Sequence, residues 1–338
     1  PLIAWLCRPL ALLPYHSAAT LWLWIGLAAT LVGSLVVART LLPASWPRTE
    51  LAVLATLVFS PAAYNLWHGQ MNPLVFLLLA LGLRGWMGGR EVECGVCLGF
   101  AAGIKLAPAV LVLLLLPRRW WRGAGAALAT AAATMLAGLV VVGWQATSTW
   151  VTDVLPVLAR GNGWLYNQSW NGVVNRAADH GVLTVEPALP ALRVVSVLLS
   201  MAGVAAAVWV VRPGRAAAAR RGAEFGAGVI AMLLAGTITW YAHYVAVLIP
   251  LLAGVALWLG LPPSRRRLLG AATLVAALSF AALAPLLIAW SDMAGIVRAS
   301  HGSGWWLLLQ VCSVPALSAA MLLAALVITL RRSEALAA

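Results

Sequence analysis

Residues 94–116 read CGVCLGFAAGIKLAPAVLVLLLL, and the arrangement of this stretch decides the fold of the whole chain. Its 23 residues could cross a bilayer once as a straight helix, at about 1.5 Å per residue over roughly 30 Å of hydrocarbon. Lys105 and Pro108 interrupt the stretch near its middle, where the chain could instead turn back. Each alternative fixes the side of the membrane on which every later loop lies.

The distribution of arginine among the loops distinguishes these two arrangements. If residues 94–116 form a broken hairpin that turns between Lys105 and Pro108, 16 arginines lie on one side of the membrane and 5 on the other. A single crossing places 8 on one side and 13 on the other. Because basic loops stay in the cytoplasm, the hairpin is favoured. Lys105 then lies near a cavity on the outer side, because backbone groups freed at a break need partners inside the protein.

The composition excludes an ordinary water-soluble protein. Of the 338 residues, 63% are hydrophobic and only 9% are charged, and the mean hydropathy is +0.95. The net charge of +13 could suggest nucleic acid, but the arginines flank apolar runs instead of forming one basic stripe. We therefore expect an all-α, polytopic transmembrane helical bundle in the cell membrane, with no nucleic-acid partner.

Apolar runs of membrane-spanning length predict the number of segments. Counting the hairpin as two gives about 11 segments, and no linker or change in composition divides residues 1–338 into separate domains. The sizeable loop, at 146–189, is expected on the outer side as a substrate-binding loop. The other spans are predicted at 17–39, 50–66, 71–87, 123–145, 190–211, 223–242, 244–261, 268–290 and 305–329.

Cys94 and Cys97 form a C-x-x-C pattern within an apolar run. No βαβ pattern surrounds them, so packing inside the protein is favoured over a redox or metal-binding role. We expect neither a metal nor a cofactor.

Polar residues 68–72, His-Gly-Gln-Met-Asn, separate two apolar runs on the predicted outer face. His68, Gln70 and Asn72 supply donors and acceptors suited to hydroxyl groups or a phosphate. The alternative is an ordinary interfacial turn that caps the helix beginning at Pro73.

Lys105 has long apolar stretches on both sides, so its ammonium cannot easily reach either membrane surface. A phosphate would be a suitable partner. A helix carbonyl or a nearby carboxylate is the alternative.

The centre of the 146–189 loop mixes amides with aromatic residues and is followed by Arg176. Amides bind hydroxyl groups and aromatic faces pack on sugar rings, which is what carbohydrate recognition needs. The alternative is a belt of interfacial Trp with turn-forming Asn and Gly. The polar residues concerned are Asn167, Gln168, Ser169 and Asn171.

Trp240 and His243 lie where an apolar run reaches the same predicted face. A histidine there could bind phosphate when charged or carry a proton when neutral, although a lone interfacial histidine more often only makes hydrogen bonds.

Taken in order, these motifs resemble the polyprenyl-phosphate-sugar-dependent glycosyltransferases of the GT-C superfamily, and glycosyltransferase family 87 most closely. The likeness covers most of the chain. It rests on Pro-x(7)-Pro-Leu-x-x-Leu-Pro (Pro1 to Pro14), Gly69-Gln70-x-Asn72, Gly103-x-Lys105-x-x-Pro108 before a basic loop, Asn167-Gln168-Ser169 with Arg176, and Trp240-x-x-His243.

The resemblance implies a membrane enzyme of actinobacterial envelope synthesis. It would move a hexose, often mannose, from a polyprenyl-phosphate donor to a glycolipid or lipoglycan acceptor on the outer (periplasmic) face, without metal or nucleotide. Lys105, Arg176 and His243 would bind the donor phosphate, and His243 is also a candidate catalytic residue. The sugar or acceptor would contact His68, Gln70, Asn72, Asn167, Gln168, Ser169, Asn171 and Trp240.

The catalytic Asp of the resembled family lies in a first outer loop that would precede Pro1. We therefore expect an N-terminally truncated chain that lacks the first helix and first outer loop and is inactive alone. Two other functions stay open: a lipid-linked sugar transporter or flippase, which would need internal repeats that the sequence does not display, and a non-catalytic membrane assembly subunit.

Overall fold

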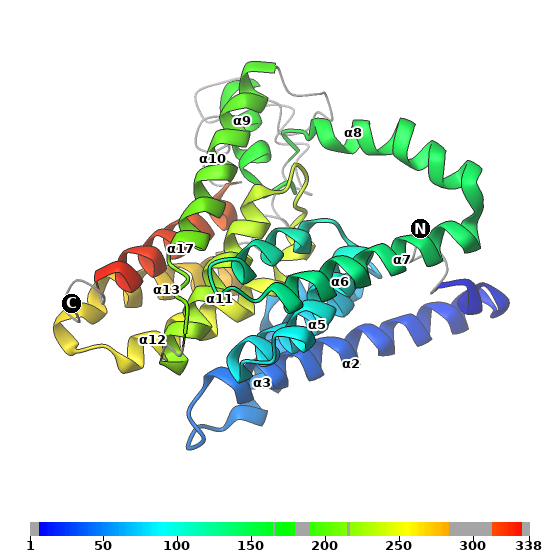
Figure 1. Cartoon of the computed structure of the whole chain (residues 1–338). Helices are drawn as coiled ribbons and strands as arrows, with labels where there is room; N and C mark the ends of the chain where they lie inside the picture. The colour runs from blue at the N-terminus through cyan, green and yellow to red at the C-terminus, as the bar shows by residue number, and fades with distance from the viewer. Residues whose placement is uncertain (1–6, 165, 180–189, 215–216, 284–312, 333–338) are drawn as a thin grey trace, which may run out of the picture.

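The structure is a computed structural model that describes residues 7–164, 166–179, 190–214, 217–283 and 313–332. Within these residues the protein is all-α, as predicted, and its single β-type contact is an isolated bridge between Asn167 and Trp240. Figure 1 shows the helices arranged around α11, with α7 and α8 extending away from the remainder.

The N-terminal half of the described chain contains two long helices among several short ones (Figure 1). In chain order the elements are η1 (Arg8–Leu12), α2 (Tyr15–Leu41), α3 (Arg48–Val58), α4 (Ser60–Trp67), α5 (Asn72–Gly88), α6 (Glu91–Ile104), η2 (Ala107–Leu115), α7 (Trp121–Thr149), η3 (Trp150–Val154) and α8 (Leu155–Arg160).

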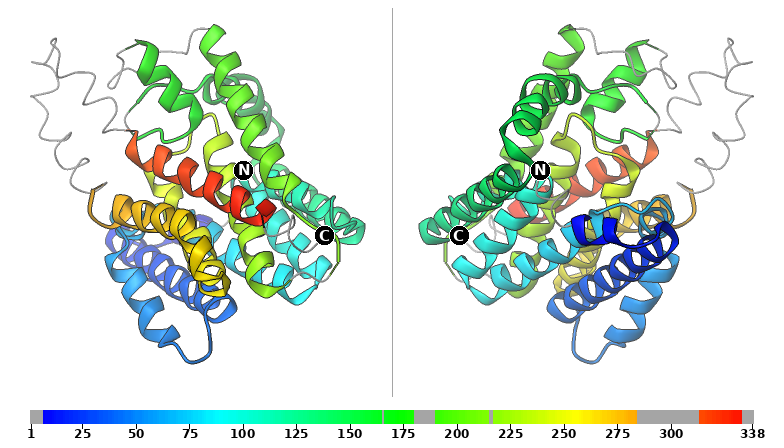
Figure 2. Two further views of the ribbon diagram at one scale, coloured as in Figure 1. Left: turned by 90° about the vertical axis from the view of Figure 1, so that its left-hand side faces the viewer. Right: turned by 90° about the vertical axis from the view of Figure 1, so that its right-hand side faces the viewer.

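The C-terminal half adds the helices that enclose the core. They are α9 (Trp170–Asp179), α10 (Pro190–Trp209), α11 (Ala218–Ala235), η4 (Tyr241–Val247), α12 (Leu248–Gly260), η5 (Pro263–Arg265), α13 (Arg266–Leu278), η6 (Ser279–Leu283) and α17 (Val314–Arg332). Figure 2 shows α17 lying along α13.

The predicted number of about eleven membrane segments is not supported. Five helices in the described part of the chain are long and apolar enough to cross a membrane. The predicted span at 50–66 divides into α3, of 11 residues, and α4, of 8. Residues 94–116 also form two short helical pieces, and α11 contains three charged residues among its 18. The five are Tyr15–Leu41, Trp121–Arg160, Ala191–Trp209, Tyr241–Gly260 and Val314–Arg332.

The chain turns back at Lys105, as the arginine distribution predicted. Helix α6 ends at Ile104, and Lys105 has an extended backbone, with φ −140° and ψ 136°. The chain that follows the 3-10 helix η2 has returned to the start of α6, because a Cβ atom built on Gly95 of α6 would lie only 2.0 Å from the carbonyl oxygen of Gly123 at the start of α7. Such an approach requires glycine at position 95. The two ends of the hairpin therefore lie side by side.

A stripe of small residues lets α6 and α7 pack side by side in parallel. Gly95, Gly99 and Gly103 recur every four residues along one face of α6. Side chains at these positions would collide with α7, since a Cβ on Gly99 would lie 2.4 Å from the Ala127 carbonyl oxygen and one on Gly103 2.1 Å from Oγ1 of Thr134. Close backbone contact of this kind is common between helices in membranes.

Helix α7 continues further than the sequence suggested. Gly143 bends it, with φ 84° and ψ 165°, but does not end it. The π-helical turn η3 and α8 follow directly, so residues 146–160 of the predicted 146–189 loop are helical. Residues 180–189 of that loop lie outside the described residues.

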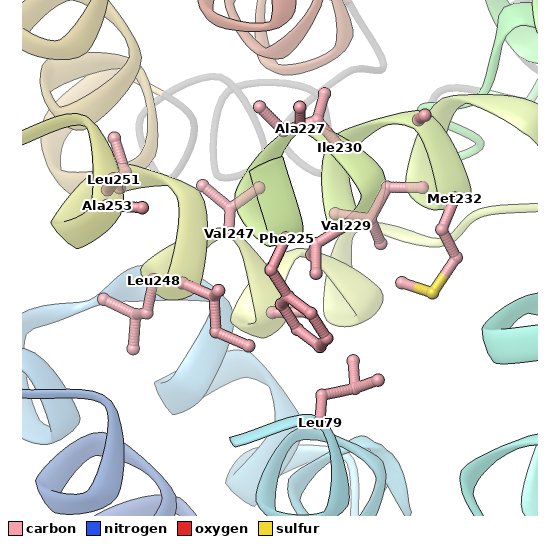
Figure 3. Packing of buried hydrophobic residues seen from close by; sticks show 14 of the residues in the cluster. Leu79, Phe225, Ala227, Val229, Ile230, Met232, Val247, Leu248, Leu251 and Ala253 are labelled. Carbon is pink, nitrogen blue, oxygen red and sulfur yellow. The ribbon is translucent and has the colours of Figure 1, made fainter. Parts of the chain in front are cut away.

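The core surrounds α11, which is buried from Gly222 to Leu234. Figure 3 shows the ring of Phe225 on α11 pointing toward Leu79 on α5, with side chains of α12 packed beside it. Phe225 and Leu79 are both fully buried. The contacts of α11 with α5, η2, η4 and α12 fix the relative positions of the segments that contain Asn72, Lys105 and His243.

Candidate functional site

Lys105, Asn72 and His243 form one polar cluster where the α6–η2 hairpin turns. The ammonium Nζ of Lys105 donates a 2.6 Å hydrogen bond to Oδ1 of Asn72 and contacts Nε2 of His243. Because the ammonium has only donors, Nε2 of His243 must be the acceptor in this contact, and the imidazole is therefore neutral. Three of the predicted site residues, far apart in the sequence, thus lie together.

Asn65, which sequence reasoning did not single out, anchors this cluster. Its Oδ1 accepts a 2.7 Å hydrogen bond from Nδ2 of Asn72. Its Nδ2 donates to the carbonyl oxygens of Pro61, at 2.6 Å, and Ala242, at 2.7 Å. Asn65 is buried, and a chain of amides therefore connects Lys105 with the backbone next to His243. The sequence signal was present, since Asn65 lies seven residues before Asn72 in an apolar region.

The backbone around the break explains why these side chains converge. Asn72 is the first residue of α5, and Pro73 follows it at a position where a helix tolerates proline. His243 lies in the first turn of η4, where its amide donates to the Trp240 carbonyl oxygen at 2.8 Å. Lys105 occupies the extended residue between α6 and η2. Each side chain therefore comes from the end of a helix.

The cluster has an uncompensated positive charge among the residues that the structure describes. Lys105 forms no ion pair there, and both of its hydrogen-bond partners are neutral. A cavity of about 30 Å³ adjoins Lys105 and His243, and none of the described residues that line it is acidic. This volume admits a water-sized group. A larger anion would have to separate Lys105 from His243 on entry.

The polar centre of the predicted loop lies in a second, internal cluster. Asn167 is fully buried, and its Nδ2 donates to the carbonyl oxygens of Asn162, at 2.9 Å, and Thr237, at 3.0 Å. Its Oδ1 accepts from the amide of Thr239, at 3.0 Å, and from the hydroxyl of Ser169, at 2.8 Å. These bonds join the loop after α8 to the segment between α11 and η4.

Gln168 and Asn171 also form hydrogen bonds within the protein. The backbone N–H of Gln168 donates to the Thr239 carbonyl oxygen at 2.7 Å, and its backbone carbonyl oxygen accepts from the hydroxyl of Tyr244, also at 2.7 Å. The side-chain Oε1 of Gln168 accepts from the amide of Ala316 at 3.3 Å. Asn171 is buried and accepts hydrogen bonds from Asn175. Sugar or acceptor contact by Asn167, Gln168, Ser169 and Asn171 stays a prediction. The described contacts of these side chains are with the protein itself.

Arg176 is 1% exposed, and it forms hydrogen bonds with residues outside the Lys105 cluster. It donates to the carbonyl oxygens of Trp164, at 2.9 Å, and Asn167, at 2.7 Å, and to the hydroxyl of Ser313, at 3.1 Å. Its binding of a donor phosphate also stays a prediction. In the structure the guanidinium forms hydrogen bonds both with the loop and with Ser313, the residue before α17.

Three other predicted residues border the two clusters. His68 is exposed and stacks on Tyr64, with ring centroids 3.9 Å apart. Gln70 is partly buried, and Trp240 meets the Trp164 ring edge-on at 5.7 Å. These side chains are more accessible than the Asn167 group.

The segment 237–244 links the two clusters, a connection that no spacing in the sequence indicates. Thr239 pairs with Gln168, and the Tyr241 amide donates to the Tyr166 carbonyl oxygen at 3.0 Å. A few residues later, His243 reaches Lys105. Backbone hydrogen bonds therefore join the loop to the segment that contains His243.

Comparison with known proteins places this arrangement in a family. Residues 1–237 match the sequence profile of Glycosyltransferase family 87. No solved structure matches the chain.

Two curated relatives bear the same description, polyprenol-phosphate-mannose-dependent alpha-(1-2)-phosphatidylinositol pentamannoside mannosyltransferase. The protein from Mycolicibacterium smegmatis is 33% identical over 188 residues, which cover 53% of this chain and 44% of the relative. The protein from Mycobacterium tuberculosis is 27% identical over 334 residues, which cover 90% of this chain and 72% of the relative. Because the family profile matches well over half of its length, the chain belongs to glycosyltransferase family 87.

Proposed function

We propose that this protein moves mannose from a polyprenyl-phosphate donor to a glycolipid of the cell envelope, on the outer face of the membrane. The printed names of both relatives support the donor and the kind of acceptor. The arginine distribution supports the outer face, because the basic loops lie on the side opposite Lys105.

One observation supports the location of the donor phosphate most strongly: the ammonium of Lys105 is partly buried with only neutral partners. A buried charge is costly unless it is paired. A phosphate that entered beside Lys105 would supply the missing negative charge, and its oxygens would accept charge-assisted hydrogen bonds. His243, released from Lys105, would take up a proton from solvent at Nε2 and then donate a further hydrogen bond to the phosphate.

In the proposed reaction, a hydroxyl oxygen of the acceptor attacks the anomeric carbon of mannose as the bond from that carbon to the phosphate oxygen breaks. Negative charge builds on the departing phosphate, which Lys105 and His243 would stabilise. The hydroxyl proton needs a general base. None of the described residues that line the Lys105 cavity is acidic, and His243 is assigned to the departing phosphate, so we assign the base to no residue of this cluster.

We assign the sugar or acceptor contacts to the accessible side chains at this end, His68, Gln70 and Trp240. Asn72 would orient Lys105. We propose that Asn167, Gln168, Ser169, Asn171 and Arg176 shape the surrounding loop, and that any contact they make with substrate requires the loop to open.

Reconstitution of the full-length protein into vesicles tests the function. The vesicles would contain polyprenyl-phosphate mannose with a radiolabelled sugar, and extractable glycolipid would be added as acceptor. We expect label to move into the glycolipid fraction. Movement of labelled donor between leaflets, without transfer, would identify a transporter and reject the proposal.

A further inference from the structure

A second polar hollow lies at the end of the bundle opposite Lys105. It has a volume of about 690 Å³, and seven described residues line it. Arg118 follows η2, and Arg221 lies in the first turn of α11. This hollow plays no part in the proposed transfer reaction. Its lining consists of Met87, Gly88, Gly89, Arg118, Trp120, Gly214 and Arg221.

The charges beside this hollow do not balance among the described residues. Glu224 is fully buried and pairs with Arg118 at 2.9 Å and with Arg220 at 3.0 Å. Arg221 donates to the carbonyl oxygen of Met87 instead of a carboxylate. Two guanidinium groups thus share one carboxylate, and that of Arg221 has no carboxylate partner among the described residues.

The two arginines that line the hollow have donors to spare. Arg118 is 7% exposed, and its Nε has no hydrogen-bond partner among the described residues. The buried Nε of Arg221 also has none. Leaving a buried charged donor unpaired is costly, and such donors are normally satisfied.

The position of Arg118 is fixed by its surroundings. Its guanidinium lies 4.0 Å over the Trp86 ring and 5.3 Å from the centre of the Trp120 ring. The indole Nε1 of Trp86 donates to the Arg221 carbonyl oxygen at 2.8 Å. Trp86 therefore holds the guanidinium of Arg118 and the backbone of Arg221, while the Met87 carbonyl oxygen holds the Arg221 guanidinium. A preorganised pair of guanidinium groups loses little freedom when an anion binds.

From the excess charge, the unpaired buried donors and the polar hollow together, we infer that Arg118 and Arg221 form a binding site for a phosphate group. The group could belong to an anionic phospholipid or be free phosphate. It would occupy the hollow beside Gly89, where a side chain would meet no atom within 4 Å. The site is distinct from the one proposed for the donor, so Lys105→Met should leave it unchanged.

The test measures the melting temperature of the full-length protein in neutral detergent. Inorganic phosphate is titrated against chloride at equal ionic strength, because salt alone screens exposed charges. At about ten times the dissociation constant, we expect phosphate to raise the Tm of the wild type by about 2 °C. In parallel, native mass spectrometry measures retention of phosphatidylglycerol relative to phosphatidylcholine.

Two pairs of variants make the test specific. Arg221→Gln removes one of the two donors, and Arg267→Gln removes an exposed arginine that does not line the hollow. Gly89→Asp places a carboxylate at the hollow, and Gly89→Asn has the same backbone conformation, with φ 73°, without the charge. Asn and Asp both tolerate this conformation.

We expect Arg221→Gln and Gly89→Asp to lose at least half of the response, and Arg267→Gln and Gly89→Asn to keep it. A response to phosphate identifies a free-phosphate site, and selective retention of phosphatidylglycerol alone identifies a lipid headgroup. No response to either ligand, or equal loss in Arg221→Gln and Arg267→Gln, would overturn the inference. Because Gly89→Asp leaves both arginines in place, a folding failure of Arg221→Gln alone does not prevent the test.

Discussion

The ammonium of Lys105 donates to Oδ1 of Asn72 at 2.6 Å, so the cation at the break of the hairpin is held by a neutral amide. An amide orients the ammonium without cancelling its charge. A carboxylate in the same place would compete with an anionic ligand. This relationship leaves Lys105 available to a phosphate while its direction is already set.

Asn65 is predicted to act as a positioning residue for this cation. In Asn65→Ala, Asn72 loses its 2.7 Å partner and Ala242 loses a donor, so both Lys105 and His243 become less well placed. We expect the KM for the lipid donor to rise about five-fold, which is the order of one neutral hydrogen bond. Steady-state kinetics with varied donor measures it.

The matched control for Asn65 is Asn175→Ala. Asn175 is another buried amide that donates to a backbone carbonyl, in this case that of Asn171 at 2.7 Å. It should lower stability similarly and leave the donor KM unchanged. Equal effects of the two variants on the donor KM would show that Asn65 acts only through folding.

His243 offers a separate test of the cluster. In His243→Gln, the amide oxygen can still accept from Lys105, but the amide cannot take up a proton and stabilise the phosphate as a cation. We expect transfer to fall at least ten-fold while the Tm stays within about 2 °C of wild type, because the polar contact is kept. Comparison of activity with thermal unfolding checks this. Normal transfer would remove His243 from the proposed reaction.

Asn167 is predicted to stabilise the folded loop and not to bind substrate. The mixture of amides and aromatic residues in the sequence suggested instead that Asn167→Ala would lower activity at near-normal stability. Its buried amide joins Asn162, Thr237 and Thr239, and truncation leaves several of these groups unpaired. We expect a loss of roughly 2 to 3 kcal/mol in the free energy of unfolding.

Thermal unfolding in detergent measures this loss. Gln145→Ala, on the exposed surface of α7, serves as the control and should unfold like the wild type. If Asn167→Ala unfolds normally but fails to transfer mannose, direct carbohydrate contact by Asn167 would be favoured again.

The hairpin and the convergence of its polar partners could be predicted from the sequence. The arginine count favoured a hairpin over a single crossing, and Lys105 and Pro108 marked where it would turn. The predicted topology then placed Asn72, Lys105 and His243 at the same end. The residues that connect them could not be predicted, since Asn65 and Thr239 act through backbone carbonyls and amides whose positions depend on tertiary packing.

The number of spanning helices and the surroundings of Arg176 were harder to predict. Hydropathy records an apolar run but not where it breaks. In the run at 50–66 the sign of the division at Phe59 is Pro61, because proline favours the first turn of a helix over its interior. From the sequence, Arg176 was likewise interpreted as a cation available to a phosphate beside the amide-rich stretch. The fold surrounds it with carbonyl oxygens, which no local pattern indicates.

The sidedness of the protein is a further prediction. In a background without native cysteines, Arg160→Cys, at the end of α8, should react with a membrane-impermeant thiol reagent in intact cells. Arg267→Cys, at the start of α13, should react only after permeabilisation. Both positions are exposed, so reagent access is not limited by burial. The reverse pattern would place Lys105 on the cytoplasmic side.

The central claim is that Lys105 binds the phosphate of a polyprenyl-phosphate sugar, and Lys105→Met tests it most directly. Methionine keeps an unbranched apolar side chain but cannot donate to phosphate. In the full-length protein we predict at least a ten-fold loss of donor affinity and of mannose transfer, since a charge-assisted hydrogen bond contributes about 1.5 to 3 kcal/mol. Arg267→Gln, which removes an exposed charge, should bind donor normally. Unchanged donor affinity in a folded Lys105→Met protein would contradict the account.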